Sequence, residues 1–323
     1  MQAQTHTTSL KARRTRFRAY QLDTEGSSFS YFDGTHFTLI EARLTKQSVA
    51  SVSSEMQLCG VSNIHCLHIT SWDADHCKET DLEIILEHLN PTKIEYPGYS
   101  PSTDTGKACL AKISAFQKKR TGVKTVQMSP AYIASLDRAE AWGYRDIVYH
   151  PTYITDNSND NSTVKLFRTG SFSVASLGDV ESVGISAYLK RQNTFKDEVD
   201  VMILAHHGAD NGFTTNAFLR VVNPTLAVCS SNFGNQYDHP RQDIREMLFQ
   251  HDIPIFTTKT GDVIIESISP HNRDYRVTNL KADSQEIASQ KTFRAKKVSK
   301  LDHNYDTVKQ LYTQRRPFYS RFR

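Results

Sequence analysis

Four short polar clusters, each at the end of an apolar stretch, constrain the fold of this chain more than any other feature. They are "SWDADH" at 71–76, "GD" at 178–179, "HHG" at 206–208 and "YDHP" at 237–240. Each cluster carries Asp or His, and the stretches before them have the apolar composition of buried strands. Strand-rich halves separated by predicted helices are typical of an α/β sandwich, which is the fold class we expect.

Periodicity and turn signals predict the elements around these clusters. Short apolar and aromatic runs over 16–42, with a turn signal at 33–34, predict three antiparallel strands. Leucine and isoleucine residues at helical spacing predict a helix over 80–90. The segment "PIFTTKTGDVIIES" at 254–267 predicts a hairpin that turns near Gly261.

The first cluster holds more ionisable groups than packing explains. In an extended loop the side-chain period of two directs Asp73 and Asp75 to the same side, and the turn into the next helix brings His76 alongside. Carboxylates crowded in this way repel one another unless a cation neutralises them. The pattern therefore favours metal binding.

Each cluster taken alone has a simpler explanation. Asp73 and Asp75 can cap the following helix, and the pair at 178–179 is a common turn. His206 and His207 can form a partly buried pair that is hydrogen-bonded to the backbone. The repeated setting, with Asp or His after each apolar strand, favours a metal site over coincidence.

Length and composition are those of a globular protein. The chain has 323 residues, enough for one large or two ordinary domains with a buried core. We expect a cytoplasmic protein with no membrane partner, because no segment reaches the roughly 20 apolar residues of a membrane span and the N-terminus lacks a secretory signal. The five cysteines show no CxxC pairing and predict neither a disulfide framework nor a thiolate zinc cluster.

Positive charge is concentrated at the two ends of the chain. Residues 1–20 carry a net charge of about +5 and residues 281–323 about +7, which leaves about −8 for the middle. Such arms can neutralise phosphates, and aromatic residues in the C-terminal arm can stack on bases; a merely solvated tail is the alternative. We expect basic arms at 1–15 and 271–323 around a folded body at 16–270.

In their order, the clusters resemble the metallo-β-lactamase fold superfamily, and more closely the hydrolase domain of the ComEC or Rec2 competence protein family. That branch typically reads Thr-His-x-Asp-x-Asp-His, then Asn-Ser before a strand ending Gly-Asp, then His-His-Gly-Ser and Tyr-x-His-Pro. Here "TSWDADH", "DNSTVKLF", "SLGD", "AHHGAD" and "YDHP" follow in the same order over roughly residues 16–268. The resemblance implies a four-layer αββα sandwich of the metallo-β-lactamase type.

The resemblance also implies roles for individual residues. The implied metal ligands are Asp73, Asp75, His76, Asp179 and His206. Asp75, His76 and His206 would hold one ion, with Asp179 as the bridging ligand and Asp73 at a second position. Ser71 stands where the family has its first histidine, which weakens that second position. We therefore expect one or two divalent ions, with Mn²⁺ or Mg²⁺ as plausible as Zn²⁺.

The leading hypothesis is metal-dependent hydrolysis of a phosphodiester, as in a nuclease or phosphodiesterase acting on nucleic acid or a nucleotide. A bound cation would lower the pKa of its water and stabilise charge on the phosphoryl oxygens. Asp75 would orient that water, and His239 or His207 would polarise the substrate or protonate the leaving group. Candidates for the substrate pocket are Asn161, Ser162 and Tyr237.

The alternative is a non-catalytic or partly degenerate interaction module that keeps the fold, with Ser71 marking decay of the site. The presence of Asp75, His76, Asp179 and His206 argues against complete decay. Because this fold supports many chemistries, the substrate rests on the family resemblance and on the basic arms.

Overall fold

Two β-sheets form the centre of the protein. The computed structural model describes residues 10–139 and 144–302. The larger sheet has nine strands in the order β15-β14-β13-β1-β2-β3-β4-β5-β6, and the smaller has six in the order β12-β11-β10-β9-β8-β7. The strands of the larger sheet are β1 (Arg16–Ala19), β2 (Phe29–Phe32), β3 (Phe37–Ile40), β4 (Cys66–His68), β5 (Lys93–Pro97), β6 (Lys124–Met128), β13 (Val263–Ser267), β14 (Asp274–Leu280) and β15 (Ile287–Arg294). Those of the smaller sheet are β7 (Ile147–His150), β8 (Val164–Phe167), β9 (Val174–Ser176), β10 (Val201–Ile203), β11 (Leu226–Cys229) and β12 (Ile255–Thr257).

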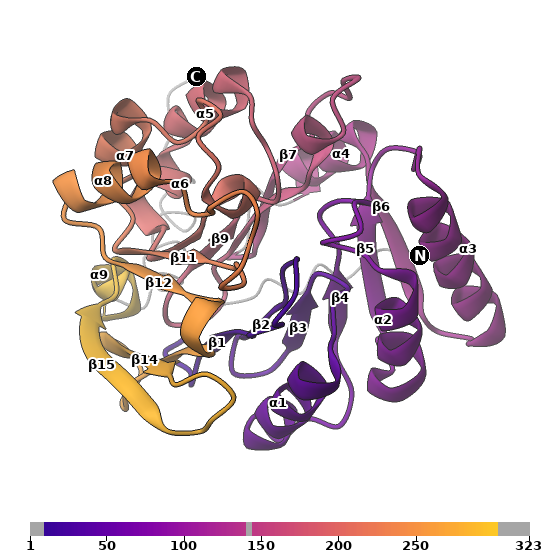
Figure 1. The fold of residues 1–323 in the computed structure, drawn as a ribbon, viewed down its shortest axis with the longest axis horizontal. Helices are drawn as coiled ribbons and strands as arrows, with labels where there is room; N and C mark the ends of the chain where they lie inside the picture. Colours follow the sequence, from indigo (N-terminus) through magenta and orange to yellow (C-terminus); the bar gives the residue numbers. More distant parts are fainter. Residues whose placement is uncertain (1–9, 140–143, 303–323) are drawn as a thin grey trace, which may run out of the picture.

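Helices cover the outer faces of the two sheets (Figure 1). The nine-stranded sheet is covered by α1 (Lys46–Leu58), α2 (Glu79–Ile84) with its π-helical continuation (Ile85–Leu89), and α3 (Asp104–Lys119). The six-stranded sheet is covered by α5 (Val183–Lys190), α6 (Asn193–Glu198), α7 (Asn216–Val222) and α8 (Gln242–Gln250). The remaining helices are α4 (Pro130–Ala139), between β6 and β7, and α9 (Val298–Asp302), after β15.

Three buried hydrophobic clusters fill the spaces between these layers. The cluster between the sheets includes Phe17 and Ile203, the one under α1 to α3 includes Leu67, and the one under α5 to α8 includes Met202. Met202 and Ile203 are neighbours on β10 and point to opposite faces, as the pleat of a strand requires. The predicted four-layer αββα sandwich is therefore confirmed.

The larger sheet changes from antiparallel to parallel pairing at β3. The three antiparallel strands predicted over 16–42 are present as β1, β2 and β3. From β3 onward, β4, β5 and β6 pair in parallel. In sheets of this kind the loops at the carboxyl ends of the strands lie along one edge, where functional side chains collect.

The hairpin predicted over 254–267 is wrong. β12 pairs in parallel with β11 in the smaller sheet, whereas β13 pairs antiparallel with β1 in the larger one. The chain passes from one sheet to the other at Gly261, whose φ is +139° and where a β-carbon would lie 2.1 Å from the carbonyl oxygen of Leu280. A glycine between two apolar runs indicates a sharp change of direction but does not reveal which neighbour each run will pair with.

Residues 274–302 extend the larger sheet and pack against the body. β14 pairs antiparallel with both β13 and β15. After β15, the buried Lys297 donates from Nζ to the carbonyl oxygen of Arg168 at 2.6 Å. The boundary predicted after residue 270 therefore falls between two paired strands. Of the predicted basic arms, residues 1–9 and 303–323 lie outside the described residues.

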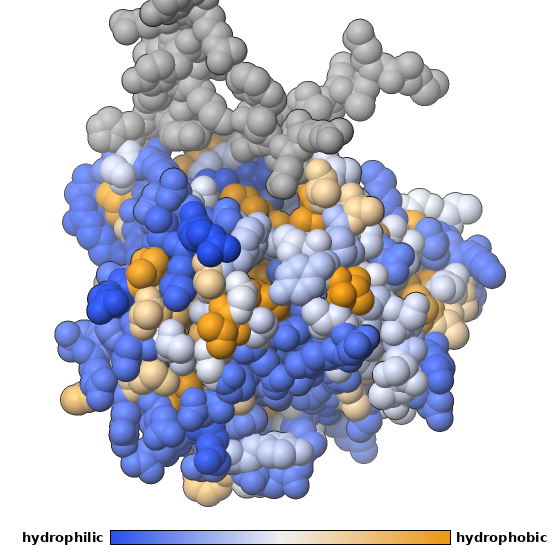
Figure 2. Space-filling view, turned by 90° about the horizontal axis from the view of Figure 1, so that it is seen from above, coloured by the Kyte–Doolittle hydropathy of each residue, from blue (hydrophilic) through white to orange (hydrophobic). Residues whose placement is uncertain are grey.

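The described surface is mostly hydrophilic on one face, and the described cysteines form no disulfide bond. On the face in Figure 2, hydrophobic side chains form small, separate groups among hydrophilic ones. No helix within residues 10–139 and 144–302 is long and apolar enough to cross a bilayer. All five cysteines carry free thiols, and all but Cys59 are buried.

Candidate metal centre

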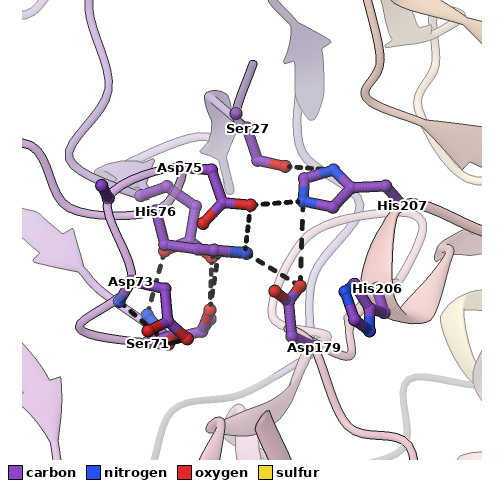
Figure 3. A network of polar contacts seen from close by, with 12 residues as sticks. Ser27, Ser71, Asp73, Asp75, His76, Asp179, His206 and His207 are labelled. Carbon is purple, nitrogen blue, oxygen red and sulfur yellow. Dashed lines mark hydrogen bonds and ion pairs between the residues drawn. The ribbon is translucent and has the colours of Figure 1, made fainter. Parts of the chain in front are cut away.

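Four ionisable side chains from three strand ends meet at one edge of the sandwich (Figure 3). Asp75 and His76 lie in the loop between β4 and α2, and Asp179 follows β9. His207 lies in a short 3-10 turn (Ala205–Gly208) directly after β10. Since β4 belongs to the larger sheet and β9 and β10 to the smaller, both sheets contribute to this cluster.

The four ligand atoms lie within 4.8 Å of one another, and we call Asp75, His76, Asp179 and His207 the metal group. The distance from His76 Nε2 to Asp179 Oδ1 is 2.8 Å, and that from His207 Nε2 to Asp75 Oδ2 is 3.1 Å. The crosswise distances, from His76 Nε2 to Asp75 Oδ2 and from His207 Nε2 to Asp179 Oδ1, are both 3.9 Å. Two imidazoles and two carboxylates therefore alternate around one centre.

Hydrogen bonds behind His76 fix the orientation of its ring. His76 Nδ1 lies 3.3 Å from both Thr70 Oγ1 and Glu41 Oε1. Thr70 in turn donates from its hydroxyl and its backbone N–H to the two oxygens of Glu41, at 2.6 and 3.0 Å. This arrangement leaves Nε2 of His76 directed at Asp179, and a buried carboxylate behind a histidine is a common support for a metal ligand.

The ring of His207 is held in the same manner by a backbone carbonyl. Its Nδ1 lies 3.0 Å from the carbonyl oxygen of Ser230 and 3.4 Å from Ser27 Oγ. Because a carbonyl oxygen only accepts hydrogen bonds, Nδ1 carries the proton. Nε2, which faces Asp75, is then the nitrogen available to bind a metal.

The charges of the metal group balance one another. Burial alone would lower the pKa of His76, but Asp179, Asp75 and Glu41 outweigh burial and raise that pKa well above its usual range. Burial likewise opposes protonation of His207, yet Asp75 and Asp179 raise its pKa. Burial would raise the pKa of Asp75 and of Asp179, whereas the nearby imidazoles hold both below their usual range. A divalent cation can replace the two imidazole protons, since a histidine must be neutral to bind metal.

The donor set fits a divalent cation. Imidazole nitrogen suits Zn²⁺ and Mn²⁺, and carboxylate oxygen suits Mn²⁺ and Mg²⁺. His76 Nε2 and Asp179 Oδ1 are both buried and face each other at 2.8 Å, so a nitrogen and an oxygen of the kinds that bind such ions already point at one centre. Among residues 10–139 and 144–302, this is the one group of His, Cys, Asp and Glu side chains with such spacing.

His206 and His207 point in different directions. Both have left-handed backbone torsions, with φ of 46° and 53°, a conformation that costs about 1–3 kcal/mol for a residue with a side chain. His206 Nδ1 lies 2.7 Å from Glu181 Oε1, and its ring stays outside the metal group. The structure therefore brings His207, expected to be catalytic, to the other ligands and does not bring His206, expected to be a ligand.

Asp73 also lies outside the metal group. Its Oδ2 accepts a hydrogen bond from Ser71 Oγ at 2.9 Å, and Ser71 Oγ lies 3.1 Å from the hydroxyl of Tyr99. Ser71 and Asp73 pair with each other on the far side of His76 from His207 (Figure 3). Among the described residues, one group of candidate ligands is assembled, and Asp73, which was expected at a second position, is paired with a hydroxyl instead.

Asn161 and Ser162 are buried behind the site and do not line its pocket. Asn161 accepts from the N–H of Thr155 and donates to its carbonyl oxygen, both at 2.8 Å. Ser162 packs against Gly178, where a β-carbon would lie 2.7 Å from Ser162 Cβ. Both residues therefore support the loops that carry the site.

A pocket of about 70 Å³ opens beside the metal group. Asp75 and His207 form part of its wall, together with His206, His239 and Tyr237. Burial, with the nearby His207 and His206, lowers the pKa of His239 to about 4. His239 is therefore neutral at pH 7 and can form a hydrogen bond with a ligand in the pocket.

Two carboxylates of the site were not predicted from the sequence, namely Glu41 behind His76 and Glu181 behind His206. Glu181 is held by the side-chain amides of Asn157 at 3.1 Å and Asn159 at 3.0 Å. Both carboxylates could have been suspected from the sequence, because Glu41 directly follows the apolar strand "FTLI" and Glu181 lies two residues after Asp179.

Two competence proteins are similar to this chain in sequence. It is 26% identical over 211 residues to ComE operon protein 3 of Bacillus subtilis (strain 168), a match that covers 64% of this chain and 25% of that protein. It is 28% identical over 104 residues to competence protein ComA of Neisseria gonorrhoeae, covering 32% of this chain and 14% of that protein. The chain thus spans a quarter or less of the length of these curated relatives, and no protein-family model matches it. The resemblance to the competence protein family is confirmed.

The matches among solved structures are more distant in sequence. Igni18, a metallo hydrolase from the hyperthermophilic archaeon Ignicoccus hospitalis, is 14% identical, with a TM-score of 0.48 over 78% of this chain and 98% of that one. A diphosphatase from the PhnP family is 12% identical, with a TM-score of 0.36 over 67% of this chain and 85% of that one.

Proposed function

We propose that this chain is a metal-dependent hydrolase that cleaves a phosphodiester in nucleic acid or a nucleotide. The observation that carries the proposal is the metal group, in which two histidines and two carboxylates from separate strand ends converge within 4.8 Å. The similarity to competence proteins and the basic ends of the chain support nucleic acid as the substrate class.

Four side chains would hold the ion, and their neighbours keep them in place. When bound, a divalent ion lowers the pKa of a coordinated water and offsets charge on phosphoryl oxygens. The ligands would be Asp75, His76, Asp179 and His207. Glu41 and the carbonyl of Ser230 hold the two imidazoles so that Nε2 of each faces the centre.

His206 and His239 line the pocket without belonging to the metal group. Glu181 holds Nδ1 of His206 at 2.7 Å, which leaves Nε2 available to donate a proton to the leaving oxygen. Because the pKa of His239 is lowered to about 4, its neutral ring suits a hydrogen bond to a phosphoryl oxygen. We therefore assign proton donation to His206 and substrate positioning to His239.

The test is hydrolysis of bis(p-nitrophenyl) phosphate and of single-stranded, double-stranded and cyclic nucleotide substrates with Mn²⁺, Mg²⁺ or Zn²⁺. Asp179→Asn should abolish turnover, because it removes a ligand charge without a change in volume. Asp210→Asn is the matched control, since Asp210 is exposed and lies outside the metal group. No hydrolysis of any phosphodiester by the metal-loaded protein would reject the proposal.

A non-catalytic module is the competing function, and metal content separates the two. Protein purified without chelator should hold about one ion per chain if the metal group is intact. A metal content far below one ion per chain, with a correctly folded protein, would favour the non-catalytic module.

A further inference from the structure

Three aromatic rings are stacked from the metal group out to the solvent. The rings of His207 and His239 are nearly parallel, with an interplanar angle of 8° and centroids 6.2 Å apart. The ring of Tyr237 stacks on His239 at 5.5 Å and 24°. Exposure increases along the series, from the largely buried His207 to Tyr237, which is 58% exposed.

Internal hydrogen bonds hold the loop that carries Tyr237 and His239. Asn235 accepts from the N–H of His239 at 2.6 Å and donates to the carbonyl oxygens of Asn232 and His239 at 3.0 and 3.1 Å. Arg241 donates to the carbonyl oxygen of Tyr237 at 3.2 Å. The side chain of Tyr237 is therefore presented to solvent by a loop with defined internal hydrogen bonds.

A second large aromatic side chain on the same loop is exposed. Phe233 is 81% exposed, although removal of a phenyl ring from water is favourable. Exposed aromatic side chains are the usual platform on which proteins stack unpaired bases, and each stacked base contributes about 1–3 kcal/mol.

We propose that Tyr237, with Phe233 on the same loop, stacks on an unpaired nucleobase of the substrate, so that the site selects single-stranded nucleic acid over duplex. This inference rests on the proposed function. Two ring-to-ring steps, of 6.2 and 5.5 Å, separate Tyr237 from His207. The stacked base therefore belongs to a nucleotide next to the one whose phosphate lies at the metal group, and the substrate is an oligonucleotide.

Binding of fluorescein-labelled, phosphorothioate-linked oligo(dT) of about twelve nucleotides, followed by anisotropy at fixed salt, tests this inference. Tyr237→Ala should weaken binding about 5- to 100-fold, while Tyr237→Phe, which keeps the ring, should bind within about twofold of the wild type. Phe249→Ala is the matched control, because Phe249 is 83% exposed on α8 and lies outside the pocket.

A second probe removes the bases instead of the tyrosine. An abasic strand of the same length and charge should bind the wild type at least as weakly as oligo(dT) binds Tyr237→Ala, because it also loses any contact with Phe233, and duplex should bind more weakly than single strand. Equal binding of abasic and base-carrying strands, or unchanged affinity in folded Tyr237→Ala, would overturn the inference. Hydrolysis of bis(p-nitrophenyl) phosphate by the wild type, which involves no base, tests the proposed function separately.

Discussion

His207 Nε2 lies 3.1 Å from Asp75 Oδ2, although 132 residues separate the two along the chain. Asp75 follows a strand of the larger sheet and His207 a strand of the smaller one. An ion held by both side chains links the two sheets of the folded protein, and the unfolded chain has no comparable site. Metal binding should therefore stabilise the fold as well as the site.

Thermal unfolding with and without Mn²⁺ or Zn²⁺ measures this coupling. At a free metal concentration of 100 times Kd, the free energy of unfolding should rise by about 2.7 kcal/mol. The rise should be absent in Asp179→Asn and retained in Asp210→Asn. If neither metal changes the unfolding temperature of the wild type, the metal group does not bind an ion in solution.

The two adjacent histidines give a sharper test of the site. His207→Ala should lower metal affinity by about 10-fold or more, because it removes a ligand, whereas His206→Ala should keep the metal. Calorimetric titration of Mn²⁺ into each folded variant gives both affinities. A loss of metal in His206→Ala with none in His207→Ala would restore the ligand set expected from the family resemblance.

Glu181 should affect turnover and leave metal binding intact. Glu181→Gln removes the charge that faces His206 Nδ1 at 2.7 Å but keeps a side chain of the same size. We expect kcat for phosphodiester hydrolysis to fall by about 10- to 100-fold with KM little changed, because the imidazole loses the charged partner that orients it. An unchanged kcat in the folded variant would show that Glu181 only packs the loop.

The sequence identified the strand ends because Asp and His after apolar runs are visible without a structure. It also favoured a shared metal site, because Asp or His follows each apolar strand. Asp75, His76 and Asp179 meet there as expected from the resemblance.

What the sequence did not reveal depends on backbone torsions and on long-range pairing. The positive φ values of His206 and His207 decide which ring faces Asp75, and no local pattern in "AHHGAD" specifies them. The crossing at Gly261 depends on the pairing of β13 with β1, which lies about 250 residues earlier in the chain. Both features are set by tertiary packing.

The buried Lys297 predicts a pH dependence of stability at alkaline pH. Burial lowers the pKa of Lys297 from 10.5 to about 8 against the opposing pull of Glu198 and Asp200. Between these two values the unfolded chain binds a proton that the folded protein lacks, so this group makes the free energy of unfolding rise with pH. Lys297→Met should lack that rise. The difference in the free energy of unfolding between wild type and variant should therefore grow by up to about 3 kcal/mol as the pH increases.

Urea unfolding of both proteins between about pH 7.5 and pH 10.5 measures the difference, and the other titrating groups cancel because both proteins share them. Parallel curves for the two proteins over this range would show that Lys297 titrates alike in the folded and unfolded states.

A truncation that tests the basic C-terminus must keep the folded elements before it. Removing residues 281–323 would delete β15, α9 and the buried Lys297, so the resulting loss of binding would be confounded by misfolding. Ending the chain after Asp302 keeps these elements and removes five Lys and Arg residues and one Asp. If all five cations contact phosphates, their contribution to single-strand affinity falls about 10²-fold as salt rises from about 50 to 200 mM. The truncated protein should bind oligo(dT) more weakly and with a flatter salt dependence, while its unfolding temperature stays that of the full chain. The same salt slope in both proteins would show that the C-terminus makes no phosphate contacts, and selection of nucleic acid would then depend on the pocket and Tyr237.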